Sequence, residues 1–267
     1  MGLPPGPFIV DAHEDLACHC QQFGRQLDSA EGCSVPVMIT LPRLQELGVR
    51  LVCATLFVPH ELAPGERLYK LFSQYEMYLE WFSRFNREIR LIKSRSDLAA
   101  LAAADPVDGE SGPRPIGFIL LMEGLELMSS AAELSTWFER GVRIASLTWN
   151  GKNIFASGCH SDNEGLTSRG LELIAEFERL GLILDLSHLN DAGIADVFRR
   201  FGGPVCSTHS NARQVADHQR NLTNAQLQKL AERGGVVGLN LLASLVRTGW
   251  RRGMELPTAA DAARHAE

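Results

Sequence analysis

The sequence contains no long, uninterrupted hydrophobic run. Its longest nearly apolar stretch, from Gly234 to Val246, is broken by Asn240 and Ser244 and is too short to cross a bilayer. Residues 1–6 lack the basic and apolar regions of an export signal. We therefore expect a cytoplasmic protein with no membrane segment.

Basic charge and cysteine are also scarce. The 26 Lys and Arg residues are outnumbered by 32 Asp and Glu, which leaves a net charge of −6. Phosphate binding needs basic patches, so no nucleic-acid partner is expected. The six cysteines are scattered through 267 residues, a chain too large to depend on a disulfide framework, and we expect them to be reduced.

The sequence does contain a regular alternation of strand-like and helix-like segments. Apolar, β-rich runs predict strands at about 8–13, 49–58, 116–122, 142–149, 182–187, 204–208 and 235–241. Amphipathic spacing predicts helices over 67–90, whose apolar side chains should be core, and over 171–180, 190–200 and 223–233. Four glycines, each just before a strand, are expected to end helices in the left-handed conformation: Gly48, Gly141, Gly181 and Gly234.

These elements predict the fold class. Nearly all-apolar strands that alternate with helices indicate a parallel sheet covered by helices. Polar residues follow the carboxyl ends of many different strands, which favours a (β/α)8 TIM-like barrel over an open sheet with one switch point. We expect a single barrel domain over residues 1–267.

Metal-ligand side chains follow several of the predicted strands. His13 and Asp15 are two residues apart, so they point to the same side of a strand, although a lone pair of this kind could also be a surface His and a turn-forming Asp. Glu123, His188 and His209 end three later strands. If the barrel closes, all five converge on one mouth. Five such ligands exceed the needs of one ion and suit two divalent metals, with Glu123 between them and a bridging hydroxide as the nucleophile for hydrolysis.

Three further residues are candidates around this centre. Arg220 is either a solvated loop cation or, beside a metal site, a fork for a substrate carboxylate. Asp11 has the same strand parity as His13 and is expected to orient it, and Asp185 is expected to act similarly elsewhere in the site.

Seven short motifs resemble those of the membrane (renal) dipeptidases, a dizinc branch of the amidohydrolase-like barrels. In order, they are 11–16 (DAHEDL), 123–124 (EG), 147–150 (LTWN), 185–188 (DLSH), 207–213 (STHSNAR), 220–223 (RNLT) and 234–238 (GGVVG). The resemblance spans essentially the whole chain. It implies that His13 and Asp15 bind one zinc ion, that Glu123 bridges, and that His188 and His209 bind the other. It also implies that Arg220 holds the C-terminal carboxylate of the substrate.

The chain departs from the family pattern at two places. Trp149 stands where the vertebrate enzymes have a carbonyl-polarising His, so Asn150 or Asn153 is expected to help a zinc ion in that role. The helix opened by Thr258-x-x-Asp261 is expected to contain the last residue, Glu267, so the eighth strand and the proton-shuttling Asp that ends it in the family would be missing. Open sheet edges would then favour pairing with another chain, including a homodimer, and activity and stability would be low.

The expected function is a zinc-dependent dipeptidase for small dipeptides with a free C-terminal carboxylate. One alternative keeps the site but changes the substrate to another amide, a lactone or a cyclic peptide. A second alternative is a catalytically impaired relic that binds metal without hydrolysing a substrate.

Overall fold

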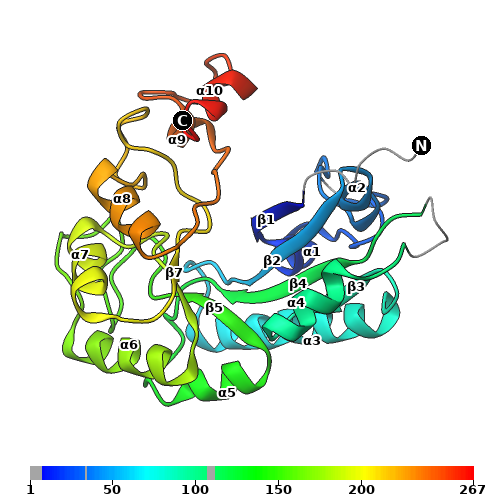
Figure 1. The fold of residues 1–267 in the computed structure, drawn as a ribbon, viewed down its shortest axis with the longest axis horizontal. Helices are drawn as coiled ribbons and strands as arrows, with labels where there is room; N and C mark the ends of the chain where they lie inside the picture. The colour runs from blue at the N-terminus through cyan, green and yellow to red at the C-terminus, as the bar shows by residue number, and fades with distance from the viewer. Residues whose placement is uncertain (1–7, 34, 107–111) are drawn as a thin grey trace. The chain divides into compact units, whose positions relative to one another are not determined.

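The computed structural model describes residues 8–33, 35–106 and 112–267, and its chain forms two compact units (Figure 1). Unit 1 comprises residues up to Met122 together with Gly141–Arg143, and unit 2 comprises Glu123–Arg140 and Ile144–Glu267. Every paired strand within each unit is parallel, as the sequence predicts.

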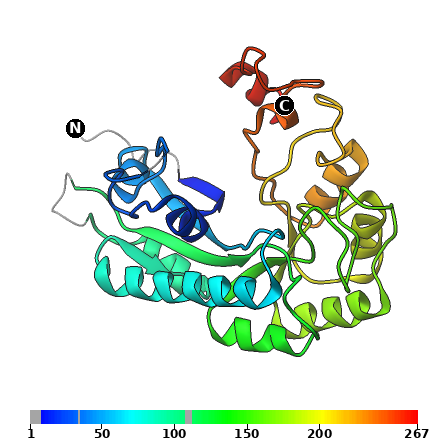
Figure 2. The same cartoon turned by 180° about the vertical axis from the view of Figure 1, so that it is seen from behind.

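Unit 1 is built on a parallel sheet in which β2 lies between β1 and β4, and β3 pairs with the start of β4. The strands are β1 (Ile9–Glu14), β2 (Val49–Leu56), β3 (Ile89–Leu91) and β4 (Ile116–Met122), and the helices are α1 (Leu16–Phe23), α2 (Leu41–Glu46), α3 (Pro64–Arg84) and α4 (Arg95–Ala102). The long helix α3 runs along the sheet (Figure 2). Strands β2 and β4 are buried almost throughout because nearly all their side chains are apolar.

Unit 2 carries the parallel pairs β5–β6 and β6–β7. Its strands are β5 (Val142–Ser146, which begins in unit 1), β6 (Ile183–Asp185) and β7 (Val205–Cys206), and its helices are α5 (Glu133–Glu139), α6 (Ser168–Leu180), α7 (Asp191–Arg200), α8 (Asn224–Glu232), α9 (Ala243–Val246) and α10 (Ala259–Ala263). Helix α5 packs beside α6 (Figure 1).

Helix ends in both units follow the local sequence signals. Thr223 and Gln226 form a capping box at the start of α8, and the Asn190 side chain caps α7 by accepting from the Gly193 amide. The four glycines expected at helix ends all have positive φ, between 69° and 106°. Helix α10 starts with the predicted Thr258 cap but ends at Ala263, so the expectation that it extends to Glu267 is wrong.

Two further predictions about secondary structure are wrong. Residues 235–241 do not form a strand, and a single bridge joins Val237 to Ser207. Backbone hydrogen bonds join Val236 and Gly238 to residues 207–210. Glycines at 234, 235 and 238 offer no side chain to pack, and Val236 and Leu241 are exposed, so little side-chain packing supports a longer strand. The helix predicted over 67–90 ends at Arg84 because the chain turns before β3.

The buried face of α3 also differs from the prediction. Leu71, Gln74, Tyr78 and Trp81 are buried, whereas Leu68, Phe72 and Leu79 are at least 37% exposed. Gln74 is buried because its amide accepts from the Phe57 backbone N–H (2.9 Å) and donates to the Phe57 carbonyl (2.6 Å). A polar residue therefore takes a place on the face that helical periodicity assigns to apolar side chains.

No helix in the described part of the chain is both long and apolar enough to span a membrane. All six cysteines are free thiols, as the sequence predicts.

Candidate metal centre

Glu123 is the first residue after β4, and its side chain is buried. The seven strand residues before it are largely apolar, so they lie in the core and leave the carboxylate at the carboxyl end of the strand. The next residue, Gly124, has φ +74°, and its amide donates to Ser146 Oγ at the end of β5 (2.8 Å). This turn joins the first residues of unit 2 to the end of β5.

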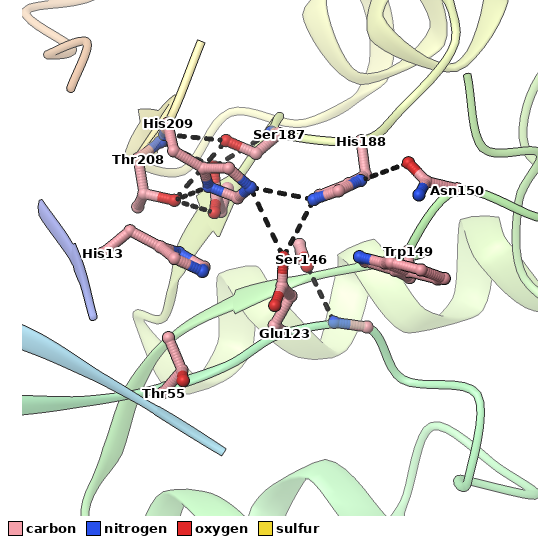
Figure 3. A network of polar contacts seen from close by, with 12 residues as sticks. His13, Thr55, Glu123, Ser146, Trp149, Asn150, Ser187, His188, Thr208 and His209 are labelled. Carbon is pink, nitrogen blue, oxygen red and sulfur yellow. Dashed lines mark hydrogen bonds and ion pairs between the residues drawn. The ribbon is translucent and has the colours of Figure 1, made fainter. Parts of the chain in front are cut away.

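The two histidines expected to be ligands meet Glu123 within unit 2 (Figure 3). His188 Nε2 lies 2.8 Å from Glu123 Oε1 and 2.8 Å from His209 Nε2, and His209 Nε2 lies 3.4 Å from Glu123 Oε1. His188 follows β6 and His209 follows β7, so neighbouring parallel strands deliver both rings to one edge of the sheet. Imidazole nitrogen and carboxylate oxygen are the usual N and O ligands of zinc.

His188 has a left-handed backbone, with φ 69°, and no other described non-glycine residue has positive φ. Such a conformation is unfavourable for most side chains and is found at functional sites where the surrounding structure enforces it. Here the Cys159 amide donates to the His188 carbonyl (2.8 Å), which helps to hold the turn. With this backbone conformation, the His188 ring faces Glu123 (Figure 3).

Hydrogen bonding of His209 leaves its Nε2 as the ligand atom. Thr208 Oγ1 donates to Asp185 Oδ2 (2.5 Å) and lies 2.9 Å from His209 Nδ1. The single hydroxyl proton is used toward Asp185, so the hydroxyl oxygen accepts from Nδ1–H. His209 Nε2 then carries a lone pair directed toward Glu123 and His188. Electron-pair donors that face one another in this way fit a shared cation.

Asp185, expected to act behind a ligand, is completely buried and accepts a hydrogen bond from Thr208, the residue before His209. Its carboxylate also accepts from the backbone amides of Ser187 and Thr208 (2.9 Å each). These bonds join the ends of β6 and β7, so one carboxylate orients both the strand ends and the His209 ring. Thr208 was not expected from the sequence, where it is distinguished only by its place next to His209.

The other two expected ligands, His13 and Asp15, belong to unit 1. His13 Nε2 lies 3.8 Å from Asp15 Oδ1, and Thr55 Oγ1 donates to the same Asp15 oxygen (2.5 Å). Asp11 accepts from the backbone amide of His13 (3.3 Å), where the register of β1 against β2 is irregular. Burial, together with Asp11 and Asp15, raises the pKa of the neighbouring Glu14 to about 8.

Arg220 is buried in unit 2 with only neutral acceptors around its guanidinium. It donates to Ser210 Oγ (3.2 Å) and to the His209 carbonyl (3.0 Å), and the described residues place no carboxylate within ion-pair distance of it. Burial lowers the pKa of Arg220, and this effect is partly offset by electrostatic interaction with Cys159, Glu123 and Asp185. The cationic fork is thus available for an anionic partner beside the His209 backbone.

The Trp149–Asn153 loop has contacts that the sequence did not predict. Asn153 donates to the Leu147 carbonyl (2.7 Å) and accepts from the amides of Phe155 and Ala156, so its amide holds the loop, a role different from the expected substrate contact. Asn150 Oδ1 lies 2.8 Å from His188 Nδ1. The Trp149 ring centroid is 6.0 Å from that of His188, and the Trp149 amide donates to Glu126.

Comparison with known proteins identifies a family. Residues 7–267 match the model of the membrane dipeptidase family, peptidase family M19. Dipeptidase aclJ of Aspergillus oryzae is 31% identical over 244 residues, which are 87% of this chain and 57% of that protein. The chain spans 37% to 61% of the length of the first curated relatives that it matches.

Two solved structures show the same fold. A metallopeptidase of family M19 called dipeptidase AC has a TM-score of 0.82 at 27% identity, with 97% of this chain and 79% of that chain covered. A metallopeptidase from Rhodobacter sphaeroides, solved with a phosphinate mimic of the dipeptide L-Ala-D-Ala, has a TM-score of 0.81 at 27% identity, with 97% and 80% covered. The α/β fold is therefore barrel-like, as expected.

Proposed function

Since the chain belongs to the membrane dipeptidase family, peptidase family M19, we propose that it is a zinc-dependent dipeptidase that acts on small dipeptides with a free C-terminal carboxylate. We also propose that residues 1–267 belong to a single metal-dependent hydrolase domain. The observation that carries the proposal lies within unit 2, where Glu123, His188 and His209 converge and Arg220 binds the His209 backbone.

Each residue of the proposed site has a defined task. His188 and His209 would hold one divalent ion, His13 and Asp15 would hold a second, and Glu123 would be shared between them. When bound, the ions activate water and polarise the peptide carbonyl. Asn150 is engaged with His188 and Trp149 has no imidazole, so we assign carbonyl polarisation to the ions alone.

Arg220 determines which substrates fit. A buried guanidinium surrounded by neutral acceptors is stabilised by an anion that forms two parallel hydrogen bonds with its fork. The C-terminal carboxylate of a dipeptide has that shape and charge. The Rhodobacter sphaeroides relative was solved with a dipeptide mimic, which supports a substrate of the same size for this chain.

Two experiments test the proposal. Metal analysis of the purified protein should give close to two zinc equivalents per chain, and absence of bound metal after zinc loading would overturn it. Hydrolysis is then compared for matched dipeptides with a free or an amidated C-terminus. We expect amidation to abolish turnover, whereas equal cleavage of the amides would favour the alternative of a hydrolase for other amides or lactones. Metal binding with no hydrolysis of either series would indicate a catalytically impaired relic.

A further inference from the structure

Asn150 is part of a small hydrogen-bonded group behind His188 (Figure 3). Its side-chain oxygen lies 2.8 Å from His188 Nδ1 and accepts a hydrogen bond from the Cys159 thiol (3.4 Å). Both Cys159 and His188 are buried. Asn150 thus lies on the opposite side of the imidazole from Glu123, where it touches the ring but not the ligand atom.

The backbone around Asn150 is held by the same segment. The Asn150 carbonyl accepts from the His160 amide (2.9 Å), and the Gly158 amide donates to the Gly151 carbonyl (3.0 Å). A Cβ at Gly158 would lie 2.5 Å from the Asn150 carbonyl carbon and oxygen, so only glycine permits this approach. The Cys159 amide donates in turn to the His188 carbonyl. Segment 158–160 therefore joins Asn150 to His188 through backbone as well as side-chain contacts.

In the structure, Asn150 Oδ1 faces both the Cys159 thiol and His188 Nδ1. A thiol S–H is a weak donor, and here it is directed at the side-chain oxygen of Asn150. The Asn150 oxygen, not its nitrogen, then faces the His188 ring, and an oxygen can only accept. His188 Nδ1 therefore donates, and in the neutral imidazole this leaves a lone pair on Nε2, the atom 2.8 Å from Glu123.

We propose that Asn150, oriented by Cys159, is a positioning residue that holds His188 in its Nδ1–H tautomer and so makes Nε2 a metal ligand before the ion arrives. The inference rests on the proposed metal binding by His188. In this proposal Asn150 orients the His188 ring, whereas the sequence suggested that it contacts the substrate carbonyl. A neutral acceptor on Nδ1 is the kind of partner that keeps a ligating imidazole in one tautomer and orientation.

Zinc affinity of matched variants tests the proposal without relying on activity. Asn150→Leu keeps the side-chain volume but removes the acceptor, and we expect its zinc affinity in chelator competition to fall about 10- to 100-fold. Asn150→Asp keeps an oxygen at this position and should bind zinc at least as tightly as the wild type. Equal zinc affinity of Asn150→Leu and wild type would overturn the proposal. A loss of zinc affinity in Asn150→Asp as large as that in Asn150→Leu would also overturn it, because that pattern indicates that the Asn150 amide N–H donates to His188 Nδ1.

The tautomer is also measurable in the metal-free wild type, which requires no variant to fold. Long-range ¹H–¹⁵N correlation spectra distinguish Nδ1–H from Nε2–H in a neutral imidazole, and a His188→Gln sample assigns the signal. We expect the Nδ1–H pattern for His188. An Nε2–H pattern would refute the positioning role even if zinc binds, whereas wild-type protein that binds no zinc would refute the proposed function instead.

Discussion

Replacement of Arg220 by Met should separate substrate binding from folding. Met has a similar length and no charge, so it fills the space of the side chain but cannot bind a carboxylate. Loss of one partner from a buried, hydrogen-bonded charge pair typically raises the free energy of the complex by about 2–5 kcal/mol. We therefore expect kcat/KM for dipeptides to fall about 30- to 5000-fold, mainly through KM, at about 1.4 kcal/mol per tenfold.

The same substitution should have little effect on the free protein. The Arg220 guanidinium loses its hydrogen bonds to Ser210 and to the His209 carbonyl, which contribute about 1.5–3 kcal/mol each. That loss is offset by relief from burying a cation, which destabilises the folded state by several kcal/mol. The lowered pKa of Arg220 reflects this same desolvation. The melting temperature should consequently change little, and the zinc content should not change.

The assay is a two-by-two comparison of wild type and Arg220→Met with a dipeptide and its C-terminal amide. If the guanidinium binds the carboxylate, the substitution lowers kcat/KM for the acid but changes the already poor rate for the amide only slightly. Arg220→Lys keeps the charge but loses the forked pair of donors, so its kcat/KM for the dipeptide should lie between those of wild type and Arg220→Met. An equal loss for acid and amide, or a loss of zinc from Arg220→Met, would refute the reasoning.

Three other substitutions test separate features. Thr208→Val removes the hydroxyl that orients His209 and should lower zinc affinity about 10- to 100-fold, so unchanged affinity in chelator competition would contradict the role given to this hydroxyl. Asp191 has a lowered pKa, chiefly because Arg213 donates to it. At pH values above 3.8, the usual pKa of an aspartate, this partly exposed ion pair should stabilise the folded protein by about 0.5–1 kcal/mol. This stabilisation should be lost as the pH falls through the lowered pKa that Asp191 has in the folded protein. The difference in melting temperature between wild type and Asp191→Asn should therefore vanish at acidic pH. A difference that persists there would be inconsistent with an ion pair. Gly158→Ala places a Cβ 2.3 Å from a backbone oxygen and should destabilise the protein by about 1–3 kcal/mol, whereas Gly151→Ala, with no atom within 4 Å, is the matched control in thermal unfolding and should change stability little.

The positions of the proposed ligands Glu123, His188 and His209 could be predicted from the sequence because each one follows an apolar strand. The residues from Ile116 to Met122 predict a buried parallel strand, and Glu123 then has to lie at its carboxyl end. The same reasoning places His188 and His209, since neighbouring parallel strands end at the same edge. Hydrophobic patterning thus determines where these three side chains emerge, and the structure brings their ligand atoms together.

The contacts behind the ligands could not be predicted in the same way. Thr208, Asn150 and Cys159 reach the two imidazoles through side-chain hydrogen bonds that depend on loop geometry, which leaves no periodic trace in a sequence. The strand predicted over residues 235–241 is wrong because local composition alone does not determine a strand. Their apolar composition is strand-like, but a strand also needs partners along its length, and the glycines and exposed side chains of this run allow only one bridge.

The left-handed backbone of His188 restricts the amino acids that position 188 can accept over evolutionary time. Glycine, Asn, Asp and His are the residues that tolerate this conformation best. Only His and Asp also offer an electron pair that suits a zinc ion. Sequence drift at this position should therefore be narrower than at His209, whose backbone carries no such restriction. In descendants that abandon metal binding, Asn and Gly should be the first replacements, and they would mark such lineages before any other part of the site decays.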